Sequence, residues 1–250
     1  EHIAALREDF ANRRLPVISV DAKKKELVGR FKNAGETWEQ EPVLVNDHDF
    51  LSEADGKVIP YGVYDVRANL GAVVIGTTHD TAQFAIDSIE WWWLEEGRAR
   101  YPGAQELLIL ADGGGSNAAT NRAWKHGLYH QLARRHGLTV TVAHYPPGTS
   151  KWNPIEHRLF SEISKNWAGR PLSSIETVLN YIRSTKTKTG LRVTAHLLHR
   201  EYASGVKITN AEMRELAITR HVDLPRWNYT IAPAPTPSAT TAAGRCGWWG

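Results

Sequence analysis

Three acidic residues stand where a folded chain would gather side chains at one place. Asp21 ends the apolar run VISVD, Asp112 ends the apolar run LLILAD, and Glu156 falls in the first turn of a predicted helix. A charge at the tip of a buried strand is costly unless another group compensates it. Strands in the middle of one sheet lie about 5 Å apart, so two such aspartates would converge. With a third carboxylate from a helix start they would form the oxygen ligand set that Mg²⁺ or Mn²⁺ prefers.

Each acid also has an ordinary structural interpretation. Aspartates at strand ends are common as turn formers and helix N-caps, and Asp112, which precedes GGGSN, fits that role. A glutamate in the first turn of a helix interacts favourably with the helix dipole, which is the alternative for Glu156. The hypothesis of a metal site therefore depends on the three acids occurring together at such junctions.

The residues around these acids alternate between predicted strands and helices. Apolar residues that recur at strand or helix spacing separate the two classes. Three strands come first and helices then alternate with strands, which predicts an α/β fold with helices on the faces of a mixed sheet. We expect an irregular chain from Pro225 onward. Strands are predicted over 15–22, 57–66, 70–78, 105–112 and 138–145, and helices over 1–13, 81–98, 117–136, 155–167, 173–185 and 206–219.

Length, composition and charge narrow the class of protein. A chain of 250 residues suits one α/β domain with small extensions. It contains no apolar run of 18 residues, so no membrane span is expected, and its single cysteine, Cys246, excludes an internal disulfide framework. Residues 1–112 carry 12 Lys and Arg against 20 Asp and Glu, whereas residues 113–250 carry 18 against 7. A basic half suits a polyanion such as nucleic acid, and chance clustering of solvated charges is the alternative.

Three segments of the sequence carry a family resemblance. VDAKKKELVG, LILADGGGSNAATNRAWK and HYPPGTSKWNPIEHRLFSEISKNW resemble the catalytic core of DDE transposases of bacterial insertion sequences, in the rhodopirellula-type group of the mariner-like superfamily. The resemblance covers residues 10–230 and implies a ribonuclease-H-like fold, a five-stranded mixed sheet flanked by helices. We therefore expect the end of an upstream helical region over 1–13, the catalytic domain over 14–230 and a disordered tail over 231–250. An N-terminal helix-turn-helix region, usual in such transposases, is expected to be missing.

The resemblance also implies a reaction and its partners. Asp21, Asp112 and Glu156 would be the catalytic residues and would bind two Mg²⁺ or Mn²⁺ ions, with Asp21 bridging them. Metal-activated water would nick the transposon end, and the freed 3′-hydroxyl would attack target DNA. The expected partners are both DNAs and further copies of the chain, at the nucleoid in the bacterial cytoplasm. Two alternatives stay open: an inactive or domesticated DNA-binding relative, and a ribonuclease-H-like nuclease without strand transfer.

Two lysines after the first acid and one asparagine after the second are candidates for contact with DNA. Lys23 and Lys25 suit contacts with phosphates, and an exposed charged loop is the alternative. Asn117 has the position of a helix N-cap, while the resemblance gives it a place in the site.

The loop before the third acid supplies three further candidates for contact with DNA. Lys151 suits the scissile phosphate, and Trp152 suits stacking on a flipped base, with simple packing as the alternative. Asn153 completes this group because it lies between them and Glu156.

Overall fold

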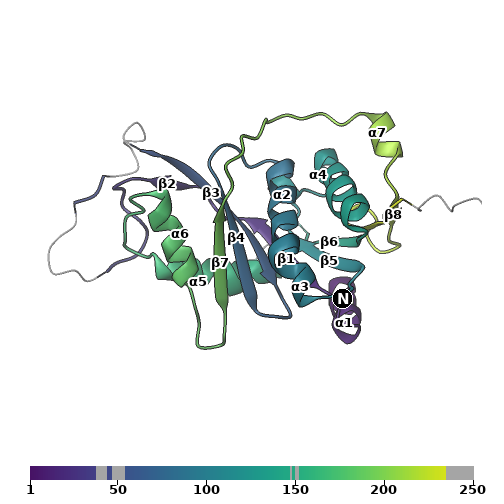
Figure 1. Cartoon of the computed structure of the whole chain (residues 1–250), viewed down its shortest axis with the longest axis horizontal. Coiled ribbons are helices and arrows are strands. Elements are labelled where there is room, and N and C mark those ends of the chain that lie inside the picture. Colours follow the sequence, from purple (N-terminus) through teal and green to yellow (C-terminus); the bar gives the residue numbers. More distant parts are fainter. Residues whose placement is uncertain (38–43, 47–53, 147, 150–151, 235–250) are drawn as a thin grey trace, which may run out of the picture.

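One large mixed β-sheet runs through the protein, as the computed structural model in Figure 1 shows. The structure describes residues 1–37, 44–46, 54–146, 148–149 and 152–234. Within them the nine-stranded sheet has the order β7-β4-β3-β1-β5-β6-β9-β8, and β2 pairs with β3 beside this path. The strands are β1 (Val17–Ala22), β2 (Glu26–Val28), β3 (Gly56–Asp65), β4 (Leu70–Gly76), β5 (Glu106–Ala111), β6 (Thr139–His144), β7 (Arg192–Leu197), β8 (Ile218–Arg220) and β9 (Asn228–Ile231).

The five central strands have the arrangement expected of a ribonuclease-H-like fold. β1 lies in the middle, antiparallel to β3 on one side and parallel to β5 on the other. β4 pairs antiparallel with β3, and β6 pairs in parallel with β5. The predicted α/β class and the mixed five-stranded core are therefore confirmed.

Three strands that the sequence did not predict widen this core. β7 adds to β4 in parallel, and β9 and β8 add antiparallel beyond β6. The irregular chain expected from Pro225 onward is wrong, because β9 pairs with β6 there. β8 and β9 are too short for a periodic signal, and β7 is half exposed. The predicted tail over 231–250 begins at the last residue of β9, and residues 235–250 lie outside the described residues.

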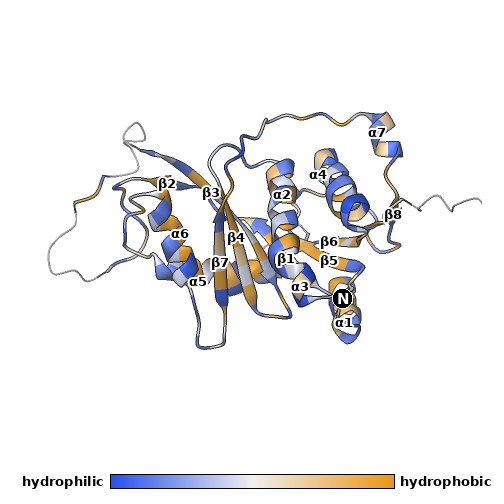
Figure 2. Cartoon of the chain, viewed as in Figure 1, coloured by the Kyte–Doolittle hydropathy of each residue, from blue (hydrophilic) through white to orange (hydrophobic). Residues whose placement is uncertain are grey.

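Helices cover both faces of the sheet. Ile18 and Val20 of β1 pack in the same cluster as Trp124, while Val17 packs with Phe10 on the opposite side. Figure 2 shows hydrophobic residues on the strands and on helix faces turned towards them. The helices are α1 (His2–Asn12), α2 (Ala82–Trp92), α3 (Arg98–Arg100), α4 (Arg122–Gly127), α5 (Ser161–Asn166), α6 (Ile175–Ser184) and α7 (Asn210–Arg214), with π-helical turns η2 (Trp93–Gly97), η4 (Leu128–Arg134) and η6 (Glu156–Phe160) and the 3₁₀ turn η3 (Gly115–Asn117).

Two of the predicted helices differ from the structure. The helix expected from Asn117 begins later, because Asn121 is its N-cap and accepts hydrogen bonds from the backbone N–H groups of Ala123 and Trp124. The glycine-rich stretch before it forms a separate turn instead. The helix expected over 206–219 is confined to α7, and β8 follows it.

Among the described residues, none of the helices combines the length and the apolar character that crossing a membrane requires.

Candidate active site

The first two acids leave neighbouring strands at the same edge of the sheet. Asp21 is the fifth residue of β1, and Asp112 directly follows β5. The two strands are parallel, and Val20 lies in register with Ala111. Because adjacent strands are about 4.8 Å apart, this register brings both aspartates to one place.

A buried hydrogen-bond network fixes the chain just before the third acid. Asn153 has no exposed surface, and the hydroxyl of Ser19 in β1 donates a hydrogen bond to its side-chain oxygen. The backbone N–H of Ile155 donates to the Ser19 hydroxyl at 3.1 Å. The start of η6, which carries Glu156, is thus attached to β1 two residues before Asp21.

A glycine in β3 lets the helix of the third acid approach the sheet closely. Gly62 lies in register with Asp21. A Cβ atom placed at Gly62 would lie 2.6 Å from the ring of Phe160 and 2.7 Å from the side chain of Ile155. These two residues flank Glu156 in sequence, so the close contact seats the third acid over the strand pair that carries the first.

The three acids interact electrostatically. Burial, then the charges of Asp112, Glu156 and Asp80, raise the pKa of Asp21 to about 8, against one backbone hydrogen bond from Ala22. Burial and the charge of Asp112 raise the pKa of Glu156. Burial raises the pKa of Asp112 too, although the backbone N–H of Gly114 donates to it at 3.2 Å.

The raised pKa values have one consequence for ligand binding. Each acid is held where its negative charge is poorly compensated by the protein. Such a set of carboxylates favours protons or metal cations as counter-charges. The structure thus brings together the three acids that the sequence singled out.

A fourth carboxylate, which the sequence analysis missed, belongs to the same region. Asp80 lies between β4 and α2, and its charge raises the pKa of both Asp21 and Asp112. Its Oδ1 atom is buried and has no hydrogen-bond partner among the described residues. The signal in the sequence was an aspartate soon after an apolar strand and directly before the helix N-cap Thr81.

Asn117 and Tyr61 form a buried pair beneath these carboxylates. The Tyr61 hydroxyl donates to Asn117 Oδ1 at 2.8 Å. Burial, then Asp21, Asp80 and Asp112, raise the pKa of Tyr61 well above its usual value, so the hydroxyl keeps its proton. Asn117 therefore lies buried next to the acids, and its predicted contact with DNA stays a prediction.

His144 joins the same layer from β6. Its two ring nitrogens lie 2.8 Å from the backbone oxygen of Asn117 and 2.9 Å from that of Trp227. Burial lowers the pKa of His144, while these two carbonyl groups and Asp112 oppose the shift. The ring links the segment after Asp112 to the residue that precedes β9.

The remaining candidates for DNA contact differ in their exposure. Lys23 is committed to an ion pair with Glu26 at 2.5 Å and lies 4.8 Å from the ring centroid of Trp167. Lys25 is exposed, and the side chain of Trp152 is 65% exposed. Asn153 is buried by the network around Ser19, and Lys151 lies outside the described residues.

The donor chemistry of the site fits a hard divalent cation. Asp21, Asp112, Glu156 and Asp80 supply carboxylate oxygen donors, and one Asp80 oxygen is buried without a partner among the described residues. Across the described ranges, no group of three or more His, Cys, Asp or Glu side chains is already arranged as a complete ligand set. Binding of an ion would therefore require the carboxylates to move towards a common centre.

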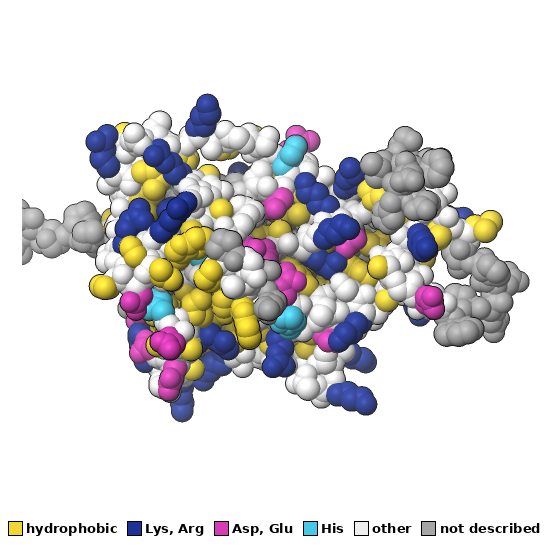
Figure 3. All heavy atoms as spheres, turned by 180° about the vertical axis from the view of Figure 1, so that it is seen from behind, with side chains coloured by type: hydrophobic (Ala, Val, Ile, Leu, Met, Phe, Trp, Pro, Cys, Tyr) yellow, Lys and Arg dark blue, Asp and Glu magenta, His cyan; other side chains and the backbone are white. Residues whose placement is uncertain are grey.

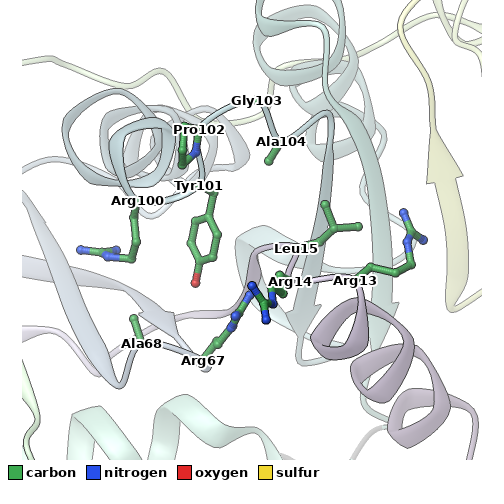
Figure 4. A pocket seen from close by; sticks show the side chains of 10 residues that line it. All are labelled: Arg13, Arg14, Leu15, Arg67, Ala68, Arg100, Tyr101, Pro102, Gly103 and Ala104. Carbon is green, nitrogen blue, oxygen red and sulfur yellow. The ribbon is translucent and has the colours of Figure 1, made fainter.

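A basic pocket of about 680 Å³ lies at the opposite ends of the central strands (Figure 4). Its lining residues precede β1, follow β3 and precede β5. The fully buried Asp65 accepts hydrogen bonds from Arg100 and Tyr101 there, at 3.1 and 2.8 Å. This paired carboxylate contrasts with the poorly compensated acids at the other end of the sheet.

The domain belongs to the ribonuclease-H-like class by its central sheet, and it carries a group of acids at one edge of that sheet. The family profile described as "Rhodopirellula transposase DDE domain" matches residues 1–233, and the chain belongs to this family. It therefore carries a transposase DDE domain, as the resemblance in the sequence implied.

Comparison with solved structures and curated proteins adds more distant likenesses. The Mos1 transposase paired-end complex with left transposon end has a TM-score of 0.47 and 15% identity over 71% of this chain and 50% of that chain. The Mos1 strand transfer complex has a TM-score of 0.47 and 16% identity, over 71% of this chain and 48% of that chain. A simian T-cell lymphotropic virus intasome in complex with a PP2A regulatory subunit has a TM-score of 0.32 and 13% identity, over 77% of this chain and 61% of that chain. The chain thus spans about half of each Mos1 chain, and no curated protein matches it.

Proposed function

We propose that this domain cuts DNA at transposon ends and joins the freed 3′-hydroxyl to target DNA in a reaction that depends on Mg²⁺ or Mn²⁺. The observation that carries the proposal is the set of three acids at one edge of the sheet of a transposase DDE domain, where the charges of Asp112 and Glu156 raise the pKa of Asp21 and the charge of Asp112 raises that of Glu156. Asp21, Asp112 and Glu156 would hold the cations. Two such ions supply an activated nucleophile and relieve charge on the leaving oxygen in phosphodiester chemistry.

Other residues of the chain would support this site without touching DNA. The Ser19–Asn153 contact would orient the segment that carries Glu156, and the Tyr61–Asn117 pair would form a rigid base beneath the acids. Asp80, with its unpartnered buried oxygen, would act as an additional oxygen donor or hold a bound water. No covalent protein–DNA intermediate is required, because the nucleophile is water and then the 3′-hydroxyl.

The partners belong to the same proposal. Transposon ends and target DNA would bind at the edge that carries the acids, and the exposed side chain of Trp152 would contact a base next to Glu156. Lys25 is exposed near Asp21 and can approach a phosphate. Two ends must be brought together for transposition, so we expect copies of the chain to assemble on DNA.

Nicking and joining assays test the reaction. Supercoiled plasmid is incubated with the protein and Mn²⁺, and a labelled duplex oligonucleotide with a free 3′-hydroxyl is added to follow joining. We expect nicked circles and labelled plasmid with the wild type, and loss of both by at least 100-fold with Asp21→Asn. Asp9→Asn on α1, an exposed aspartate far from the site, is the matched control and should keep wild-type rates.

The two alternatives give different results in the same assays. A ribonuclease-H-like nuclease would nick the plasmid but leave the labelled strand unjoined. An inactive relative would bind DNA without nicking it. Metal-dependent nicking that survives in Asp21→Asn would contradict the assignment of the acids.

A further inference from the structure

A lysine on α4 is buried among arginines. Lys125 is 7% exposed, and its Nζ atom lies 5.1 Å from the ring centroid of Tyr229. The side chains of Arg122, Arg220 and Arg226 surround it and line the same pocket of about 510 Å³. The other residues that line this pocket are uncharged. Four cationic side chains are thus gathered around one hollow.

These cations have no anionic partner in the part of the chain that the structure describes. None of the four side chains takes part in an ion pair there. Arg122 donates to the backbone oxygen of Ile208 at 3.1 Å, and Arg220 donates to that of Pro225 at 3.2 Å. A guanidinium has five N–H donors, so each arginine keeps others for a ligand.

The electrostatics of the pocket favour an anion. Burial, then the charges of Arg220, Arg122 and Arg226, lower the pKa of Lys125. Like charges around one pocket repel one another, and a bound anion would offset this repulsion. Arginine suits phosphate in particular, because its planar fork donates two parallel hydrogen bonds to phosphate oxygens.

The pocket opens at the same edge of the sheet as the acids. Arg220 ends β8, and Arg226 stands two residues before β9, whose start pairs with the end of β6. Between Arg226 and β9, the ring of Trp227 packs against Gly113, where a Cβ atom would approach it to 2.6 Å. Gly113 directly follows Asp112, so the residue after Arg226 contacts the segment that carries the second acid.

The distance between this pocket and the acids corresponds to a few nucleotides of a bound DNA strand. β9 lies two strands from β5, which corresponds to about 10 Å across the sheet. One DNA strand advances about 3.4 Å per phosphate along the helix axis, so this gap spans about three nucleotides. Figure 3 shows Lys and Arg side chains at the end of the molecule that carries α7 and β8, on the left of that view.

We propose that Arg122, Lys125, Arg220 and Arg226 form a binding site for backbone phosphates of DNA, a few nucleotides from the bond that is cut. The inference rests on the proposed function, because DNA is the ligand in both. The site binds the backbone without reading bases, so its contribution is independent of sequence. It holds the strand in register with the acids.

Salt-dependent DNA binding tests this site. A fluorescein-labelled duplex of about 30 base pairs is titrated with the full chain at 50–200 mM NaCl without divalent metal, and binding is followed by fluorescence anisotropy. The variant Arg122→Ala/Arg226→Ala removes two exposed arginines, and Lys125→Met removes the buried charge but keeps an apolar stem. The control, Arg14→Ala/Arg67→Ala, removes the same charge from the pocket at the far end of the sheet.

The expected result is a smaller salt dependence for the pocket variants alone. The slope of log K against log [NaCl] should fall by about 2 for the double variant and by about 1 for Lys125→Met, with affinity about tenfold weaker for the double variant at 100 mM salt. The control should keep the wild-type slope. Circular dichroism melting confirms that each variant is folded. A wild-type slope in the folded Arg122→Ala/Arg226→Ala variant would overturn the proposal.

Two further arms separate this proposal from its alternatives. Inorganic phosphate at 10 mM should displace little DNA; displacement of most of it would make the pocket a site for free phosphate and overturn the proposal. Plasmid nicking with Mn²⁺ is measured on the same samples. If the wild type nicks plasmid and the variants keep the wild-type salt slope, the phosphate site is rejected and the proposed function stands. If the variants have reduced salt slopes and the wild type does not nick, the proposed function is rejected and the phosphate site is supported.

Discussion

The buried hydroxyl of Ser19 donates a hydrogen bond to the side chain of Asn153, 134 residues later in the chain. Ser19 precedes Asp21 by two residues, and Asn153 precedes Glu156 by three. One contact therefore ties the strand of the first acid to the helix of the third.

Substitution of the asparagine should loosen the third acid. Asn153→Ala leaves a buried hydroxyl with one partner fewer, which we expect to lower the free energy of unfolding by about 1–3 kcal/mol. Plasmid nicking should fall by more than DNA binding, because Glu156 loses its position. Urea unfolding and the nicking assay measure the two effects. Trp152→Ala, which changes the exposed neighbour, should stay within about 0.5 kcal/mol of the wild type; equal stability of both variants would contradict this role.

A methyl group at Gly62 should push the helix of the third acid away from β3. The added Cβ would meet Phe160 and Ile155 at 2.6 and 2.7 Å, and overpacking of this kind costs about 1–3 kcal/mol. Gly62→Ala should therefore lower both the unfolding midpoint in urea and the nicking rate. Gly56→Ala in the same strand is the matched control, because nothing lies within 4 Å of its Cβ position. If the two variants behave alike, the close contact does not position the site.

The central strands and the three acids could be predicted from the sequence because strong local signals mark them. Asp21 and Asp112 follow apolar runs that are buried on both faces, and such runs are recognisable without the tertiary structure. The roles of Asp80 and of the β7–β9 extension come from neighbours far away in sequence, which local patterns do not reveal. The burial of Asn153 comes with its contact to Ser19, 134 residues earlier in the chain, so the sequence around Glu156 did not reveal it.

Asp21 should make the stability of the domain depend on pH. Its pKa is raised from 3.8 to about 8 on folding, so the folded state binds the proton more tightly than the unfolded state. Its contribution is favourable below pH 4 and is lost as the pH rises towards 8, at no more than about 1.4 kcal/mol per pH unit. Relative to Asp21→Asn, the wild type should lose stability between pH 5 and 8. Urea unfolding in EDTA measures this difference, with Asp9→Asn as control; parallel curves for wild type and Asp21→Asn would refute it.

Asp80 should have opposite effects with and without metal. Asp80→Asn removes a negative charge that raises the pKa of both Asp21 and Asp112, so the variant should melt at a higher temperature than the wild type in EDTA. The same loss of an oxygen donor should weaken Mn²⁺ binding, measured by isothermal titration calorimetry, by about tenfold. Asp55→Asn, outside this cluster of acids, should change neither quantity. A variant with unchanged Mn²⁺ affinity would remove Asp80 from the site.

The arrangement of the three acids around metal is tested most directly by a crystal structure grown with Mn²⁺, whose anomalous signal locates the ion. We predict a peak with carboxylate oxygens of Asp21, Asp112 and Glu156 at coordination distances of about 2 Å around one ion or two neighbouring ions. A fully occupied Mn²⁺ site elsewhere on the chain, with any of these three carboxylates turned away from the other two, would contradict the account.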